Sequence, residues 1–173
     1  MIAERPRTPF VAADEREMLD NWLEFHRWTL EWKCDGLTPE QLAERSVPPS
    51  SMSLLGLVRH MAEVERGWFR RCLADEDAPL LYCSDDEGGD PDGDFNAVDP
   101  ARAEDDLATW RAECAAARAN LAAVDSLDAV AKRQRREQDV SVRWIMVHMI
   151  EEYARHNGHA DFLRERIDGA VGD

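Results

Sequence analysis

Residues 141–169 read SVRWIMVHMIEEYARHNGHADFLRERIDG. At about 100° per residue, Ile145 and Leu163 fall on one side of a helix and bracket four ionisable side chains on that side. These four are His148, Glu152, His156 and His159. Because the apolar ends of the stripe must point toward a core, the polar residues between them are expected to point inward as well. The stretch therefore predicts a long helix from Ser141 to about Arg166 that brings polar side chains into the interior.

Three further segments show helical periodicity, with bounds of about Asp14–Cys34, Ser51 or Ser53–Leu73, and Ala101–Val124. The residues that share one face in these segments are, in turn, Met18, Trp22, Phe25, Thr29 and Trp32; Leu54, Leu57, Met61, Val64 and Trp68; and Leu107, Trp110, Cys114, Ala117 and Leu121. Thr38-Pro39-Glu40-Gln41 predicts a short capped turn of helix between the first two segments. Four amphipathic helices without a convincing strand predict an all-α fold, a four-helix bundle.

Two of the connections between the predicted helices are long, at residues 74–100 and 127–139. Such lengths do not suit tight antiparallel hairpins, so a simple up-down-up-down order is not expected. The first connection contains DDEGGDPDGD at residues 85–94, with six acidic residues and no basic one. Its aspartates do not complete an EF-hand pattern. We therefore expect a mobile acidic surface loop over about residues 75–99.

Length and composition limit the class of protein. The 173 residues, 44% of them hydrophobic, suit one domain with a substantial core, expected over residues 1–173. The net charge of −15 disfavours nucleic acid or an anionic membrane as a partner. No apolar stretch is long enough to cross a bilayer, and Met1–Pro9 lacks the apolar segment of a secretory signal. A cytoplasmic protein is expected.

The four cysteines do not indicate redox or nucleophilic chemistry. They are Cys34, Cys72, Cys83 and Cys114, far apart and without a Cys-x-x-Cys pair. Reduced structural thiols are the expectation in the cytoplasm. No cysteine is tied by spacing to a histidine, and the sequence contains no zinc-protease, Walker, Gly-x-Ser-x-Gly or dinucleotide-binding motif.

Helical spacing favours a metal site. Glu152 and His156 are one turn apart, so their side chains project side by side, about 6 Å along the axis. His60 lies at the edge of the second helix's apolar stripe, and bundles build metal sites from such residues on facing helices. Two nitrogens and one carboxylate form the ligand set of catalytic zinc sites with an open position. Taken singly, each residue also suits a hydrogen-bonded core histidine or a surface glutamate, and spacing alone leaves both interpretations open.

A family resemblance rests on two runs. They are SLLGLVRH at residues 53–60, followed by Val64-Glu65 and Trp68-Phe69, and the run from Arg143 to Gly169. Both resemble the actinobacterial branch of the DinB-like superfamily that was long catalogued as a domain of unknown function. The likeness extends from Glu15 to Gly169. It implies a four-helix bundle with a non-sequential helix order and long crossover connections.

The resemblance also implies a ligand set. Family members place a divalent metal, often zinc or nickel, on positions that correspond to His60, Glu152 and His156. Zinc is the first choice here, although mixed nitrogen and oxygen ligands also suit nickel or manganese. Many relatives have histidine in place of Glu152, whereas the mycothiol-dependent maleylpyruvate isomerases are similar to this chain in using glutamate. His148 and His159 are candidates for orienting the ligands or contacting substrate.

The expected function is that of a metal-dependent transferase that activates a low-molecular-weight thiol for attack on an electrophile. Related members use mycothiol or bacillithiol, and the Ala-, Arg- and Asp-rich composition favours mycothiol. The alternative is a non-enzymatic metal-binding stress or interaction protein, whose site is vestigial or closed by His148 or His159. The resemblance further implies a homodimer, to which Trp28, Trp68 and Phe69 are candidate contributors, although core packing explains these aromatic residues equally well.

Overall fold

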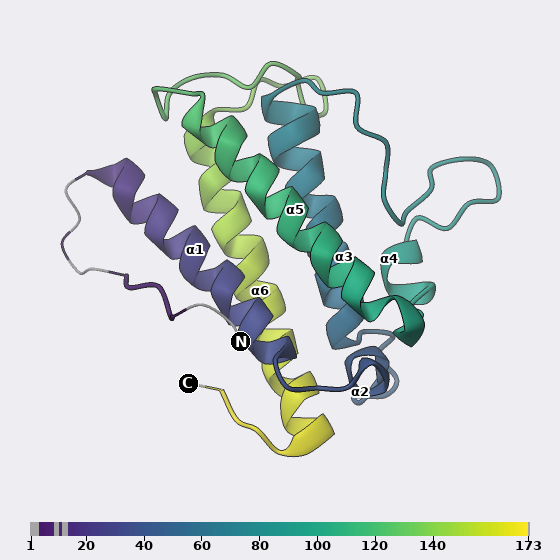
Figure 1. Ribbon diagram of the computed structural model, residues 1–173. Helices are drawn as coiled ribbons and strands as arrows, with labels where there is room; N and C mark the ends of the chain where they lie inside the picture. The colour runs from purple at the N-terminus through teal and green to yellow at the C-terminus, as the bar shows by residue number, and fades with distance from the viewer. Residues whose placement is uncertain (1–3, 9–10, 12–13, 173) are drawn as a thin grey trace.

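A computed structural model describes residues 4–8, 11 and 14–172 of the chain. Its long helices are α1 (Glu15–Cys34), α3 (Leu54–Glu65) with its π-helical continuation η1 (Arg66–Leu73), α5 (Ala103–Ala122) and α6 (Val142–Asp168) (Figure 1). The short helices are α2 (Pro39–Ala43), α4 (Gly93–Asn96) and the 3-10 turn η2 (Pro100–Arg102). No strand forms among the described residues, so the predicted all-α fold is confirmed.

Residues 1–3, 9–10, 12–13 and 173 belong to the expected domain of residues 1–173 but lie outside the described residues. The segment Met1–Pro9, which lacks the apolar stretch of a secretory signal, therefore lies partly outside the described residues. None of the described helices is both long enough and apolar enough to cross a membrane.

Polar caps set the helix ends. The side chains of Asp14, Ser53 and Ser141 each accept a hydrogen bond from the backbone N–H three residues later. Such a cap satisfies one of the amides that the first helical turn leaves unpaired. Gly169, with φ of 80°, ends α6 in the left-handed conformation that glycine adopts without strain. The starts predicted from these caps are confirmed.

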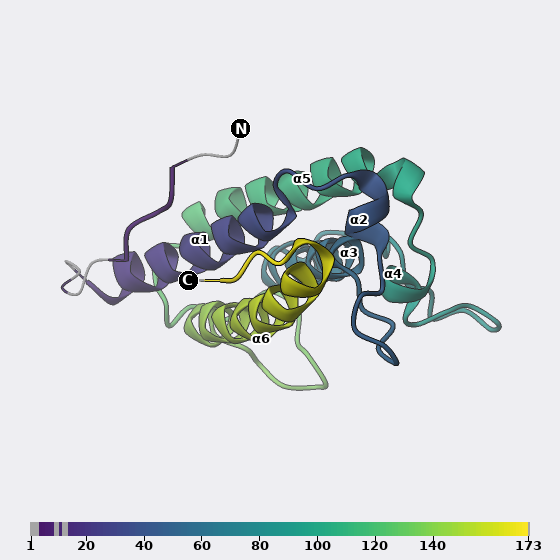
Figure 2. The same ribbon diagram turned by 90° about the horizontal axis from the view of Figure 1, so that it is seen from below.

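The first and last helices of the chain are neighbours in space. Helix α1 packs mainly on α6, and α3 packs on both α5 and α6. Figure 2 shows α1 and α5 in one layer and α3 and α6 in the other. Helices α1 and α6 run in one direction and α3 and α5 in the opposite one, so the α3–α5 connection must return along the bundle (Figure 1). The predicted departure from an up-down-up-down order is confirmed.

The predicted inner faces are confirmed for α3, α5 and α6, but not for α1. Met18 and Trp22 are 43% and 41% exposed. The buried face of α1 instead carries Leu19, Leu23 and Leu30. This face also holds the buried Arg27. Because a hydrophobicity pattern assigns a charged residue to the surface, the pattern did not indicate the leucine face.

The two aromatic residues of η1 lie in the core. Trp68 is 9% exposed and Phe69 is completely buried. For these two residues burial favours core packing, one of the two alternatives that the sequence left open, over a contribution to a dimer interface. Trp28 is half-buried and stacks on Trp32, with ring centroids 5.7 Å apart.

A buried ion pair joins the helices at the centre of the bundle. Arg27 of α1 donates two hydrogen bonds of 2.7 Å to the Glu65 carboxylate of α3. The hydroxyl of Tyr153 in α6 donates to Glu65 at 2.7 Å, and the thiol of Cys114 in α5 lies 3.6 Å away. Burial alone would lower the pKa of Arg27, but the Glu65 carboxylate raises that pKa well above its ordinary value. All four long helices thus meet at one carboxylate.

Replacing Arg27 by leucine is expected to lower the free energy of unfolding by about 3–5 kcal/mol, because Glu65 stays buried without its counter-charge. Arg27→Leu/Glu65→Gln removes both charges and should recover part of that loss. Arg118→Leu, which removes an exposed pair with Glu24, is the matched control and should cost less than about 1 kcal/mol. Urea unfolding followed by circular dichroism measures all three. Equal losses in the two single variants would contradict the account.

Candidate metal centre

His60, Glu152 and His156 lie together where α3 meets α6. Each offers one ligand atom, a ring nitrogen or a carboxylate oxygen, and these atoms lie within 4.8 Å of one another. The ring centroids of His60 and His156 are 4.7 Å apart, and Nε2 of His156 lies 3.5 Å from Glu152 Oε2. One turn of α6 supplies two of the groups, and packing against α3 supplies the third. The structure brings all three sequence-predicted ligands to one place.

The three side chains differ in their access to water. The His156 side chain is 11% exposed, whereas those of His60 and Glu152 are 24% and 16% exposed. Burial, together with the neighbouring His60 and His159, lowers the pKa of His156 to about 4. Its imidazole is therefore neutral at neutral pH and has a nitrogen lone pair to offer.

The Glu152 carboxylate faces imidazoles rather than a guanidinium. Its Oε1 lies 3.6 Å from His148 Nε2, and its Oε2 faces His156. Three buried carboxylates elsewhere in the described part of the chain pair with arginine: Glu65 with Arg27, Asp106 with Arg59, and Glu113 with Arg66 and Arg70. An anion beside imidazoles, one of them neutral, is a donor set that suits a divalent cation.

His148 lies beside this trio in a cluster with two tryptophans. Its ring is nearly parallel to that of Trp144, at 4.8 Å and 22°, and lies at a steep angle to that of Trp68, at 4.9 Å. The two tryptophan rings also contact each other, with centroids 5.2 Å apart. Nδ1 of His148 lies 3.7 Å from Glu151. These aromatic contacts hold the ring next to Glu152.

His159 contacts the other edge of His156. The two Nδ1 atoms are 3.4 Å apart, so His159 sits opposite the Nε2 atom that faces Glu152.

Asp94 is a site residue that sequence reasoning missed. It is 3% exposed, and its Oδ2 lies 2.8 Å from Nδ1 of His60. Residues 85–92 are exposed as predicted, but residues 93–96 form α4, which packs on α3. The prediction of a surface loop over residues 75–99 is therefore wrong at this end. One signal was available in Phe95, an aromatic residue beside the acidic run, whose ring stacks on His60 at 5.0 Å.

The cysteine thiols are poor nucleophiles in this fold. Cys34, Cys72 and Cys114 are buried and Cys83 is half-buried, and all four are free. Burial raises the pKa of Cys34 to about 12 and that of Cys83 to about 11. These thiols stay protonated at neutral pH, as expected for structural cysteines.

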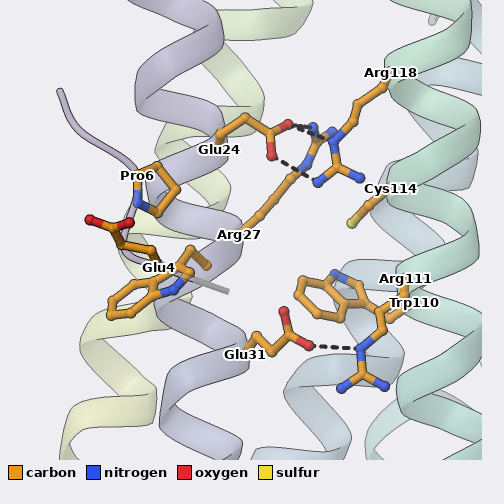
Figure 3. A pocket seen from close by; sticks show the side chains of 10 residues that line it. Glu4, Pro6, Glu24, Arg27, Glu31, Trp110, Arg111, Cys114 and Arg118 are labelled. Atoms are coloured by element: carbon orange, nitrogen blue, oxygen red, sulfur yellow. Dashed lines mark hydrogen bonds and ion pairs between the residues drawn. The ribbon is translucent and has the colours of Figure 1, made fainter. Parts of the chain in front are cut away.

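A cavity of about 330 Å³ lies in the other layer, between α1 and α5 (Figure 3). Its walls carry three arginines, but each is paired with a glutamate. Arg27 and Arg118 bond to Glu24, and Arg111 bonds to Glu31. The arginine charges are thus compensated within the wall, and the groups of described residues that could hold a metal ion lie elsewhere.

Comparison with known proteins identifies the family of the chain. No curated protein matches the chain. A family model described as mycothiol S-transferase matches residues 18–169, a range that contains His60, Asp94, Glu152 and His156. The match covers most of the chain, and the family is DinB-like, as the resemblance implied. The chain belongs to the mycothiol S-transferase family.

Proposed function

We propose that this protein is a divalent-metal-dependent S-transferase that joins the thiol of mycothiol to an electrophilic carbon of a second substrate. Membership of the family supports the choice of thiol. The observation that supports metal binding is that ligand atoms of His60, Glu152 and His156 lie within 4.8 Å of one another. When bound, the cation lowers the pKa of a coordinated thiol, which in free form is about 8.5 and leaves little thiolate at neutral pH.

The ligand residues fit this task. Three protein ligands leave a coordination position open, as catalytic zinc sites require. Glu152 contributes one negative charge and the imidazoles contribute none, so a divalent cation in the trio keeps a net positive charge. That charge favours an anionic sulfur at the open position. Zinc is the first choice of metal, with nickel or manganese also suited to this donor set.

The flanking residues have separate tasks. His159 holds the ring of His156 through Nδ1. His148 forms with Trp144 and Trp68 an aromatic cluster beside Glu152 that is available for contact with substrate. In the reaction the sulfur forms a bond to the electrophilic carbon, the leaving group departs with its electron pair, and the thiol proton passes to water. No thiol of the protein takes part.

The metal assignment predicts metal content. Protein purified without an affinity tag should contain near-stoichiometric divalent metal, and His60→Ala and His156→Ala should lose most of it, because each removes a ligand. His26→Ala is the matched control, since His26 lies on α1 and outside the trio. Elemental analysis measures the content. Undiminished metal in both ligand variants would overturn the assignment.

The thiol assignment predicts activity. Mycothiol and a bimane electrophile should give the conjugate faster with the metal-loaded protein than with chelator-treated protein, and added zinc should restore the rate. Cys34→Ala should keep the wild-type rate, because this thiol is protonated and outside the trio. Equal rates with and without metal, across several thiols and electrophiles, would refute the transferase proposal.

Cobalt substitution separates this function from a closed metal site. An open position should admit mycothiol and produce a thiolate-to-cobalt charge-transfer band during titration. A tetrahedral cobalt spectrum that ignores every added thiol would instead indicate a fourth protein ligand, His148 or His159, and a structural metal. His148→Ala and His159→Ala should then identify that ligand by changing the spectrum.

A further inference from the structure

We infer that Asp94 is a positioning residue that fixes the tautomer of His60 and so leaves Nε2 of this ring free to bind the metal. The inference rests on the proposed metal site. It gives a function to the acidic segment, residues 81–96. A carboxylate of this segment, from outside the four long helices, completes the site.

Hydrogen bonding determines the tautomer. An ionised carboxylate has only acceptors, so the Nδ1 atom of His60, 2.8 Å from Asp94 Oδ2, must be the donor. A neutral imidazole carries one proton, and with that proton on Nδ1 the lone pair lies on Nε2. The same bond holds the plane of the ring and makes the ligand more basic, as carboxylates behind metal-binding histidines do.

Asp94 is itself held firmly. Its second oxygen, Oδ1, accepts from the backbone N–H of Phe95 at 2.9 Å. Arg59, next to His60 on α3, donates to the backbone carbonyls of Gly93 and Asp94, both at 2.9 Å. A Cβ atom at Gly93 would clash with the carbonyl oxygen of Tyr82, so glycine is required for this approach. The carboxylate therefore has little freedom to leave His60.

The same helix also anchors the start of the acidic segment. Glu63 of α3 accepts the backbone N–H groups of Leu81, Tyr82 and Cys83. Arg59 and Glu63, four residues apart on α3, thus bind the residues that follow and precede the exposed run at residues 85–92. His60 lies between them on the same helix. Anchoring on both sides places Asp94 at the site, although the run between the anchors is exposed.

The second imidazole ligand is held more weakly. The Nδ1 atoms of His156 and His159 are 3.4 Å apart. An imidazole that accepts a hydrogen bond lacks the negative charge of a carboxylate. Hydrogen bonds to charged groups are stronger and shorter than neutral ones. Loss of Asp94 should therefore weaken metal binding more than loss of His159 does.

Asp94→Asn tests the tautomer directly. The amide oxygen of asparagine must stay at the Oδ1 position to accept from Phe95, which turns its NH₂ group toward Nδ1 of His60. This NH₂ group donates, so the proton of the ring moves to Nε2. In the metal-free protein, ¹⁵N chemical shifts should show His60 protonated on Nδ1 in the wild type and on Nε2 in Asp94→Asn.

Zinc affinity, measured by competition with a chelator, gives the second readout. Asp94→Asn should bind zinc about 10- to 100-fold more weakly than the wild type. Asp94→Ala removes the same charge without imposing the wrong tautomer, so it should lose less. Asp92→Asn, an exposed change of equal charge, should bind like the wild type.

Two results would overturn the inference. One is an unchanged His60 tautomer in Asp94→Asn, and the other is an equal loss of zinc affinity in Asp94→Asn and Asp94→Ala, which would indicate charge alone. Wild-type protein that binds no zinc would instead refute the proposed function. The tautomer measurement stands apart from that outcome, because it is made on metal-free protein.

Discussion

The rest of the bundle depends on the contacts of one buried carboxylate, that of Glu65. Arg27 neutralises it through two hydrogen bonds, and the Tyr153 hydroxyl donates a third bond to Oε1. A buried charge is tolerated only with such complete pairing. Tyr153 directly follows Glu152, so its bond to Glu65 fixes the rotation of α6. With Tyr153 in the core, Glu152 and His156 face α3, where His60 lies five residues before Glu65.

The long helices and their chemistry could be predicted because each has many turns of regular pattern. In α6 the polar stripe ends in Ile145 and Leu163, and both are buried as predicted. The same reasoning failed for α1, where Arg27 interrupts the leucine face. A hydrophobicity pattern counts a charged residue as outward-facing, and only the partner on another helix shows that this charge is buried.

The acidic segment marks the limit of sequence reasoning. Its composition is that of a solvated loop, and α4 is too short to show periodicity. What places Asp94 at His60 is a set of contacts with Arg59 and Glu63, which lie far away in the sequence. Such pairings leave no local pattern. The site thus draws on three segments, α3, α4 and α6, of which the sequence indicated two.

Anomalous diffraction at the zinc edge, on crystals of the zinc-loaded protein, tests the central claim most directly. The account predicts one strong peak between α3 and α6, about 2.0–2.2 Å from Nε2 of His60, Nε2 of His156 and a carboxylate oxygen of Glu152. Asp94 should remain bonded to Nδ1 of His60 behind the metal. A peak at any other group of residues, or none at this one, would contradict the account.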